Sequence, residues 1–450
     1  MEANKVKSQL NNKKHSLYDL CVYFDNTSFN EDEGQVDKFV GLRFIDGKLS
    51  VYFPVGYSKP DAADEKQVRR DILNLVSVLS TFTTKESSIN NPSFFNEKEV
   101  DFPIHAYLYI INDFLNHGYY QQKEQIYRRS ASGKISWSRT IKQIRPQIID
   151  GSVVYLDFIT HHTNHNENEL ITLIHKFCVH ECFEKLGYLF SSYIPQKSPL
   201  GFNKNLFTSV IKNKASSTFN EAELLLFKNM LDVINSMDSS GEKKNFIFGT
   251  DNFHHVWEQL VDQVYGESDK DSFYPKVYWK LKNSSKTFSF SEKRNSLRPD
   301  TIMITNRGRD NQKIFVLDSK YYRYGATKNP NHLPDSASVV KQIAYAQYID
   351  NLDNREKLPR DVSTHISSEN IYNAFIMPAD NNAAENIGYV SADYVLPQDA
   401  EDTQKPYHKI YGILLDIKSL MYRHIPQDKE LIAELSNLIT KNSAGVAGGV

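Results

Sequence analysis

Two apolar runs separated by a short polar turn constrain the fold of this chain more than any other feature. The runs are LRPDTIMIT (297–305) and KIFVLDSKYY (313–322), and NRGRDNQ lies between them. Their length and branched apolar residues are typical of buried strands, and the intervening turn favours a hairpin. Unlike ordinary core strands, both runs carry an acid at the end away from the turn, Asp300 and Asp318.

A symmetric hairpin would place these two aspartates side by side. Asp300 lies nine residues before Arg309, and Asp318 lies nine residues after it. Like charges directly opposed across a sheet are destabilising, so this register requires a compensating group, and a bound divalent cation is the obvious one. The two-residue period of a strand puts Lys320 on the same face as Asp318, about 7 Å further along, and Ser319 on the opposite face.

A third acid comes from the segment before the hairpin. NFHHVWEQLVDQVYG (252–266) has the apolar spacing of an amphipathic helix, and Glu258 flanks its apolar stripe. With Asp300 and Asp318, Glu258 completes an all-oxygen ligand set suited to Mg²⁺. Such a metal lowers the pKa of an attacking water and neutralises charge on a phosphate, while Lys320 can orient the water or stabilise the transition state. These residues therefore predict metal-dependent hydrolysis of phosphodiester bonds.

The same residues resemble a known nuclease superfamily. Glu258 on a helix, RPD ending at Asp300 and LDSK ending at Lys320 resemble the motif of the PD-(D/E)xK nucleases, over roughly residues 250–420. The resemblance implies an α/β (α+β) fold of the restriction-endonuclease type, in which helices flank a mixed sheet. It also implies that Asp300, Asp318 and Lys320 occupy the core positions of the motif, with Glu258 as the helical acid.

A helix expected at 337–350 follows these motifs and carries Lys341, Gln342 and Tyr345. Many relatives in the superfamily place accessory polar residues there. The spacing differs from the Q-x-x-x-Y pattern of the RecB-like branch, so we give these three residues little weight.

A second resemblance covers most of the chain. GKISWSRTI (133–141), VYFPVGY (51–57) and the helix at 252–266 resemble LlaJI-type restriction endonucleases. Those enzymes are related to McrC-type nuclease subunits, which work with a GTP-driven AAA+ partner. The resemblance implies the cleavage subunit of a GTP-dependent, McrBC-like restriction system for phage defence. Such a subunit cuts double-stranded DNA after a McrB-like AAA+ GTPase has recognised and translocated it. The chain has no G-x-x-x-x-G-K-[ST] signature of its own.

Three other interpretations stay open. The chain could be a self-sufficient type II restriction endonuclease. It could also be a non-catalytic module with a nuclease-like fold that serves assembly or DNA binding. In the simplest interpretation, Asp300 and Asp318 are solvated strand ends and Lys320 is only a salt-bridge partner.

The D-x-K motif is short, and the chain contains it three more times, as Asp46-Gly47-Lys48, Asp64-Glu65-Lys66 and Asp416-Ile417-Lys418. The first lies in a turn signal and the second opens a helix. The third is a serious alternative, because YGILLDIK also has the pattern of a strand. Its nearest upstream acid in strand context is Asp380, a long polar stretch intervenes, and no amphipathic helix precedes it. We therefore favour Asp318.

At 450 residues the chain is too long for one ordinary domain. The polar, glycine-containing stretch DSSGEKKN (238–245) predicts the boundary. Residues 1–237 then form a partner-docking or DNA-associated region of mixed strands and helices, and residues 246–440 form the nuclease domain. In the first region we expect strands around a turn at Asp46-Gly47, and helices at 65–82, 106–121, 169–190 and 221–237.

Composition narrows the functional classes. The chain is 40% hydrophobic and 24% charged, as globular proteins are, and lacks an apolar run near the roughly 20 residues that a membrane helix needs. Three cysteines cannot form a disulfide framework and the N-terminus is unlike a signal peptide, so we expect a cytoplasmic protein. A net charge of −2 argues against coating nucleic acid through overall positive charge, but a local basic cleft or a partner subunit could supply it.

The segment 128–145 is basic and is expected to form strands and turns. Its cations are Arg128, Arg129, Lys134, Arg139 and Arg145. They could contact either the motor or DNA, and an exposed hairpin that serves only solubility is an equal alternative.

The segment HKFCVHEC suggests zinc, because His175, Cys178 and Cys182 share one face of a helix. No second cysteine pair completes a tetrahedral site, and helical cysteines more often pack as small apolar residues. We therefore expect core packing. His254, one turn before Glu258, is likewise expected to be structural.

Overall fold

The computed structural model describes most of the chain. The described residues are 20–23, 39–45, 48–58, 64–87, 102–149, 151–166, 169–191, 193–237, 246–275, 277–280, 282, 287–289, 298–380, 383–398 and 405–441. They form two compact units. The predicted boundary at 238–245 and the predicted turn at Asp46-Gly47 lie outside the described residues. Among those described, no helix is both long enough and apolar enough to cross a membrane.

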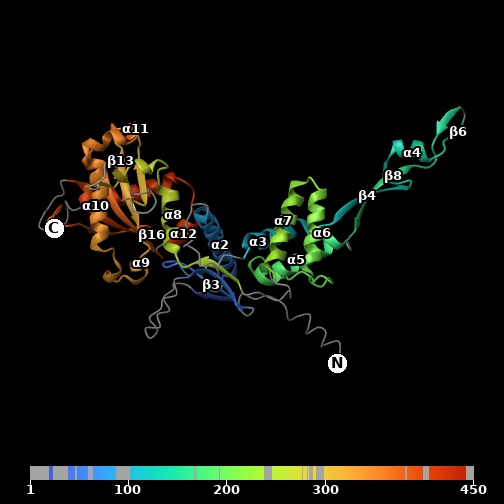
Figure 1. Ribbon diagram of the computed structural model, residues 1–450, viewed down its shortest axis with the longest axis horizontal. Helices are drawn as coiled ribbons and strands as arrows, with labels where there is room; N and C mark the ends of the chain where they lie inside the picture. Colours follow the sequence, from blue (N-terminus) through green and yellow to red (C-terminus); the bar gives the residue numbers. More distant parts are fainter. Residues whose placement is uncertain are drawn as a thin grey trace, which may run out of the picture. The chain divides into compact units, whose positions relative to one another are not determined.

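The first unit is built mainly from the described residues between 102 and 246. Four helices pack together in it (Figure 1): α3 (Ile104–His117), α5 (Leu170–Leu186), α6 (Lys204–Ser217) and α7 (Glu221–Ser236). Fully buried aromatic side chains from α5, α6 and α7 fill the space between them. Three of these helices confirm predicted ones, and α6 was not anticipated.

A long antiparallel ribbon also belongs to the first unit (Figure 1). It comprises β4 (Gln122–Arg129), β5 (Lys134–Ile135), β6 (Gln147–Ile149), β7 (Ser152–Val154) and β8 (Ile159–Asn166). The helix α4 (Trp137–Gln143) lies between β5 and β6, so the prediction of strands and turns throughout 128–145 is wrong there. The helical turn lets the buried Thr140 hydroxyl accept a hydrogen bond from the Ile159 N–H at 3.0 Å, which an extended segment would not do.

The second unit is built around a mixed five-stranded sheet of order β12-β13-β14-β16-β15. β13 is antiparallel to β12 and parallel to β14, while β16 is parallel to β14 and antiparallel to β15. Every residue of β14 is buried, as expected of a central strand covered on both faces. The strands are β12 (Thr301–Thr305), β13 (Lys313–Ser319), β14 (Ile371–Ala379), β15 (Glu385–Val390) and β16 (Ile410–Asp416).

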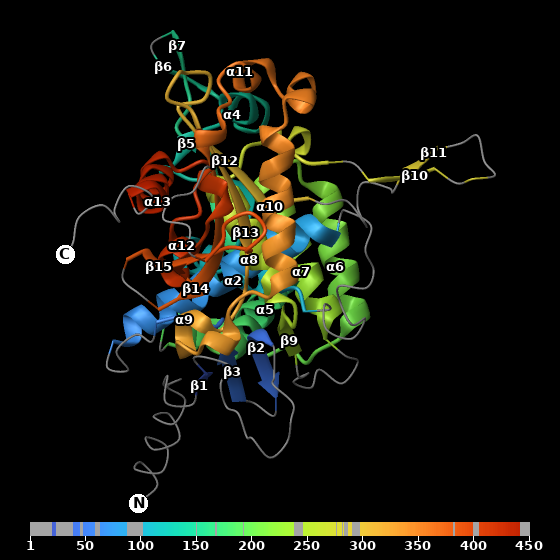
Figure 2. The ribbon, with the colours of Figure 1, turned by 90° about the vertical axis from the view of Figure 1, so that its left-hand side faces the viewer.

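Helices cover both faces of this sheet, with α10 (Ser336–Asp350) on one and α8 (Phe253–Tyr265) on the other (Figure 1, Figure 2). The predicted apolar stripe of α8 is buried at every position, namely Phe253, Val256, Trp257, Leu260, Val261 and Val264. The expected mixed sheet flanked by helices is therefore confirmed. The other α-helices of this part of the unit are α9 (Tyr324–Thr327), α11 (Arg360–Ser363), α12 (Ile417–Tyr422) and α13 (Lys429–Lys441).

Segments from near the N-terminus belong largely to this second unit, although the division at 238–245 assigned them to the first region. The long helix α2 (Glu65–Ser87) packs against α8 and α12 and confirms the predicted helix at 65–82. A four-stranded sheet has the order β1-β3-β2-β9, with β1 (Leu20–Tyr23), β2 (Val40–Ile45), β3 (Lys48–Tyr52) and β9 (Phe246–Thr250). A small hairpin joins β10 (Tyr278–Lys280) to β11 (Thr287–Ser289).

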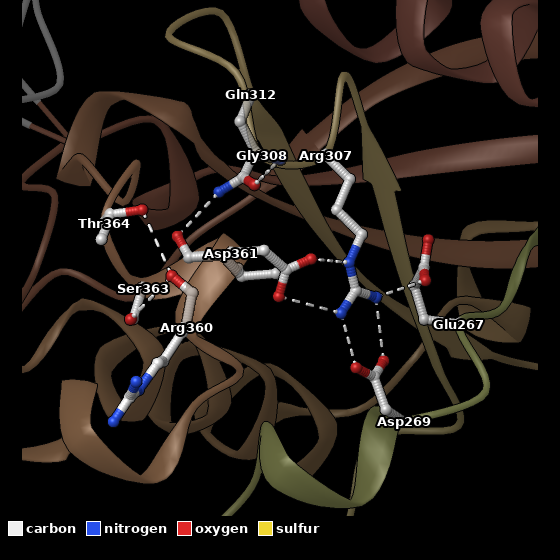
Figure 3. Close-up of polar contacts among 10 residues, drawn as sticks. Glu267, Asp269, Arg307, Gly308, Gln312, Arg360, Asp361, Ser363 and Thr364 are labelled. Carbon is white, nitrogen blue, oxygen red and sulfur yellow. Dashed lines mark hydrogen bonds and ion pairs between the residues drawn. The ribbon is translucent and has the colours of Figure 1, made fainter.

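The turn between β12 and β13 is fixed by Arg307 (Figure 3). Its guanidinium donates to Glu267 Oε2 at 2.6 Å, to Asp269 Oδ2 at 2.6 Å and to Asp361 Oδ2 at 2.7 Å. Gln312, fully buried in the same turn, accepts from Gly308 N–H and donates to the Val362 carbonyl. These contacts tie the hairpin to the loop after α8 and to α11.

Replacing Arg307 with methionine should lower the free energy of unfolding by about 2 kcal/mol, mainly because the Glu267 carboxylate, only 15% exposed, loses its donor; the more exposed Asp269 and Asp361 contribute less. Urea denaturation would measure the change. Arg309→Met is the matched control: its side chain is exposed in the same turn, and we expect a change within about 0.5 kcal/mol. Equal losses in the two variants would contradict a specific role for Arg307.

Candidate active site

The observed register of the hairpin is the predicted one. Thr301 pairs with Leu317 and Thr305 with Lys313. The same register continues one step beyond the ladder and sets Asp300 opposite Asp318. The two acids therefore meet at the end of the sheet away from the turn.

Asp300 is held by contacts other than strand pairing. Its Oδ2 accepts a hydrogen bond from Ser319 N–H at 2.8 Å, and its main-chain carbonyl accepts one from Lys270 Nζ at 2.6 Å. Burial raises the pKa of the Asp300 carboxyl well above its usual value, and the charges of Asp318 and Glu258 raise it further. The Asp300 carboxyl therefore lies near two other acidic side chains, those of Asp318 and Glu258.

Lys320 forms an ion pair with Asp318, with Nζ 2.8 Å from Oδ2. The two side chains are only 20% and 14% exposed, so they are not solvated strand ends. Burial lowers the pKa of Lys320, but the charge of Asp318 and the hydrogen bond to it more than offset this, and the pKa is raised overall. Lys320 is therefore a cation at neutral pH and is suited to electrostatic stabilisation rather than to proton abstraction.

Glu258 projects from α8 into a pocket of about 260 Å³ beside Asp300. The pocket is lined by Glu258, Gln259, Asp262, Lys270, Arg298, Pro299 and Asp300. The Glu258 carboxylate is about one third exposed and lies 3.4 Å from His255 Nδ1. Glu258 and Asp300 therefore open onto one pocket, which Asp318 and Lys320 do not line.

The donor chemistry and the local charge fit a divalent cation. Among the described residues, however, no three His, Cys, Asp or Glu side chains are grouped closely enough to hold a metal ion. Asp300 and Asp318 lie opposite each other across the hairpin. Glu258, the third predicted ligand, shares a pocket with Asp300 but not with Asp318. Mg²⁺ is usually bound by one or two carboxylates and several waters, so the carboxylates of Asp300 and Asp318 supply as many protein ligands as a Mg²⁺ site requires.

The helix α10 adds a residue to this constellation. Burial and the charges of Asp318 and Asp300 raise the pKa of the Tyr345 hydroxyl to about 12, because the phenol lies near both acids. Gln342 is fully buried and donates to the Val316 carbonyl at 2.6 Å. Lys341 is exposed. Of the three polar residues predicted on this helix, the structure therefore brings Tyr345 to the acids.

The alternative D-x-K segment has a structural explanation. Asp416 caps α12 by accepting from Lys418 N–H at 3.0 Å. The Lys418 amino group donates to Asp71 Oδ2 at 2.8 Å. Asp71 is fully buried, and it also accepts from Tyr422 Oη at 2.7 Å and from Gln67 Nε2 at 2.7 Å. This lysine links α12 to α2.

The side chains of HKFCVHEC that suggested zinc pack in the core, as the sequence led us to expect. Cys178, Cys182 and His175 are all fully buried within α5. Burial raises the pKa of both thiols and lowers that of His175 to about 4. His175 Nδ1 accepts from the Tyr120 N–H at 2.9 Å. The ring centroids of His254 and His255 are 3.9 Å apart.

Sequence reasoning missed the two cations of the pocket. Arg298 lies two residues before Asp300, within the RPD motif, so its position was available as a signal. Lys270 lies in the polar stretch ESDKDS after α8, and no pattern there distinguishes it from a surface lysine.

The basic segment lies on the ribbon of the first unit, and all five of its predicted cations are exposed. Arg129 forms an ion pair with Asp157, and Arg139 stacks over the Tyr127 ring with 3.9 Å to its centroid. Large apolar side chains between residues 137 and 156 are also exposed, namely Trp137, Ile141, Ile148, Val153 and Leu156.

A family model described as LlaJI restriction endonuclease matches residues 39–427. A curated relative, the type II restriction enzyme BsuMI component YdjA of Bacillus subtilis (strain 168), is 26% identical over 289 residues. The match covers 62% of this chain and 59% of the relative, so the chain spans less than two thirds of that protein.

A solved structure also aligns with the chain. It is a half-complex from a tetradecameric assembly of Thermococcus gammatolerans McrB AAA+ hexamers with bound McrC. The alignment covers 97% of this chain and 92% of that chain, with 13% identity and a TM-score of 0.35. At that score the likeness carries no argument about fold or partner.

Proposed function

The chain belongs to the LlaJI restriction endonuclease family, and from this premise we propose that it hydrolyses phosphodiester bonds of double-stranded DNA with bound Mg²⁺. The observation that carries the proposal is the juxtaposition of Asp300 and Asp318 across a hairpin, with Lys320 paired to Asp318 at 2.8 Å. The second unit is then a nuclease domain of the PD-(D/E)xK type with a restriction-endonuclease-like fold.

In this proposal each side chain has a distinct role. Asp300 and Asp318 would hold Mg²⁺, with Glu258 as the third ligand. The bound cation supplies activation of water and neutralisation of phosphate charge. Lys320 stays protonated and stabilises negative charge developing on the scissile phosphate, or orients the attacking water.

We further propose that the chain is the cleavage subunit of a GTP-dependent, McrBC-like restriction system in the cytoplasm. The chain has a net charge of −2 and no G-x-x-x-x-G-K-[ST] signature. Both observations are consistent with a division of labour in which a McrB-like AAA+ GTPase recognises and translocates the DNA. Apolar side chains on the ribbon are exposed, with Trp137 54% and Ile148 78% accessible to solvent, and such residues are suited to contact a protein partner. The cations of segment 128–145 are suited to contact either a partner or DNA.

A cleavage assay of the full chain on double-stranded DNA tests this function. We expect cleavage with Mg²⁺, the cognate AAA+ protein and GTP, and none after EDTA treatment or with GDP. Cleavage at fixed sites without GTP or a second protein would instead favour a self-sufficient type II enzyme. DNA binding without cleavage or carboxylate-dependent Mg²⁺ affinity would favour a non-catalytic module.

A further inference from the structure

We propose that Lys270 is a positioning residue that sets the place of Asp300 relative to Glu258, and so sets the metal affinity of the site. The inference rests on the proposed function. Lys270 begins a short 3-10 helix, Lys270–Ser272, in the loop after α8. Its side chain is only 15% exposed, which is low for a lysine and requires partners for its charge.

The Lys270 amino group joins two elements of the candidate site. It donates to Asp262 Oδ2 at 2.5 Å and to the Asp300 carbonyl at 2.6 Å. Asp262 lies four residues after Glu258 on α8, hence on the same side of that helix. Lys270 therefore connects the helix face that carries Glu258 with the main chain of Asp300.

Asp300 needs such a contact because it lies outside the strand. β12 begins at Thr301, so no ladder hydrogen bond fixes Asp300. Its carboxyl is held by Ser319 N–H and by a hydrogen bond with the Asp318 side chain, and its carbonyl accepts a hydrogen bond from Lys270. Removing Lys270 frees the carbonyl of Asp300 from its side-chain donor while leaving all three proposed ligands in the sequence.

The surrounding loop reinforces this arrangement. Glu267 N–H donates to the Ile302 carbonyl at 2.8 Å, and Asp271 pairs with Arg298 at 3.0 Å. These contacts bring the loop to the start of β12, and Lys270 supplies the contact to Asp300 itself. Asp262 Oδ1 is buried and has no hydrogen-bond partner in the part of the chain that the structure describes, so Lys270 is the cation that offsets this acid.

The test measures Mn²⁺ binding to the full chain by electron paramagnetic resonance, in the absence of DNA. Lys270→Met should weaken binding about tenfold, as loss of a group that orients a metal ligand does. This variant also leaves Asp262 uncompensated and so lowers stability. The double variant Lys270→Met/Asp262→Asn removes both charges, should regain thermal stability, and should keep the weakened binding. Lys441→Met, exposed at the end of α13, should bind like the unaltered protein.

The outcomes separate this inference from the proposed function. If the double variant binds Mn²⁺ as tightly as the unaltered protein, Lys270 does not position Asp300, and the proposed function stands. If Asp318→Asn leaves Mn²⁺ binding unchanged, the proposed metal site fails, and the role of Lys270 fails with it. If the double variant is stable and loses about tenfold in affinity, the positioning role is supported.

Discussion

Replacing Asp318 with asparagine should slow DNA cleavage about 100- to 1,000-fold while the protein stays folded. Asparagine keeps the shape of the side chain but removes the charge that, with Asp300, holds the proposed cation. Lys320→Met should give a loss of similar size, because it removes the cation from the same face of β13. Single-turnover cleavage with the AAA+ partner and GTP would measure both effects.

The chain offers a matched control in its other strand that ends in acid-x-lysine. Asp416→Asn changes the same residue type at the end of β16, where the acid caps α12. We expect its cleavage rate, per folded molecule, to equal that of the unaltered protein. Unaltered cleavage in both Asp318→Asn and Lys320→Met would refute the assignment of the site.

Lys418→Met should lower the free energy of unfolding by about 3 kcal/mol, because it leaves the fully buried Asp71 without its cation. The Tyr422 and Gln67 hydrogen bonds remain and limit the loss. Chemical denaturation followed by tryptophan fluorescence would measure it, since Trp257 is buried in α8, against which α2 packs.

Lys418→Met combined with Asp71→Asn tests the cause of that loss. Removing both charges leaves no uncompensated acid, so most of the lost stability should return. If the double variant is no more stable than Lys418→Met alone, packing of the lysine stem rather than its charge explains the effect.

The parts of the site that depend on local spacing could be predicted from the sequence. The hairpin register follows from the symmetric placement of Asp300 and Asp318 about Arg309, and the ladder from Thr301 to Thr305 confirms it. The buried stripe of α8 follows from its helical period in the same way. In both cases the residues that determine the geometry are near neighbours in the chain.

The parts that depend on distant partners could not be predicted. Lys320 and Lys418 have the same local pattern, and what distinguishes them is that Lys418 meets Asp71, 347 residues earlier in the chain. Lys270 is likewise defined by its contact with the Asp300 carbonyl across the pocket. The sequence analysis grouped Glu258, on its helix, with Asp300 and Asp318; in the structure Glu258 lines a pocket with Asp300, and Asp318 does not line that pocket.

The order of strands in the central sheet has a consequence for synthesis on the ribosome. β16 follows β15 in the chain but lies between β14 and β15 in the sheet. The helix α2, which precedes all five strands in the chain, packs against α8 and α12. A nascent chain that ends before residue 410 carries the complete acid hairpin but lacks the inner strand that supports β14. Since domains generally fold as units, we expect the central sheet of the proposed nuclease to assemble only after β16 has been synthesised.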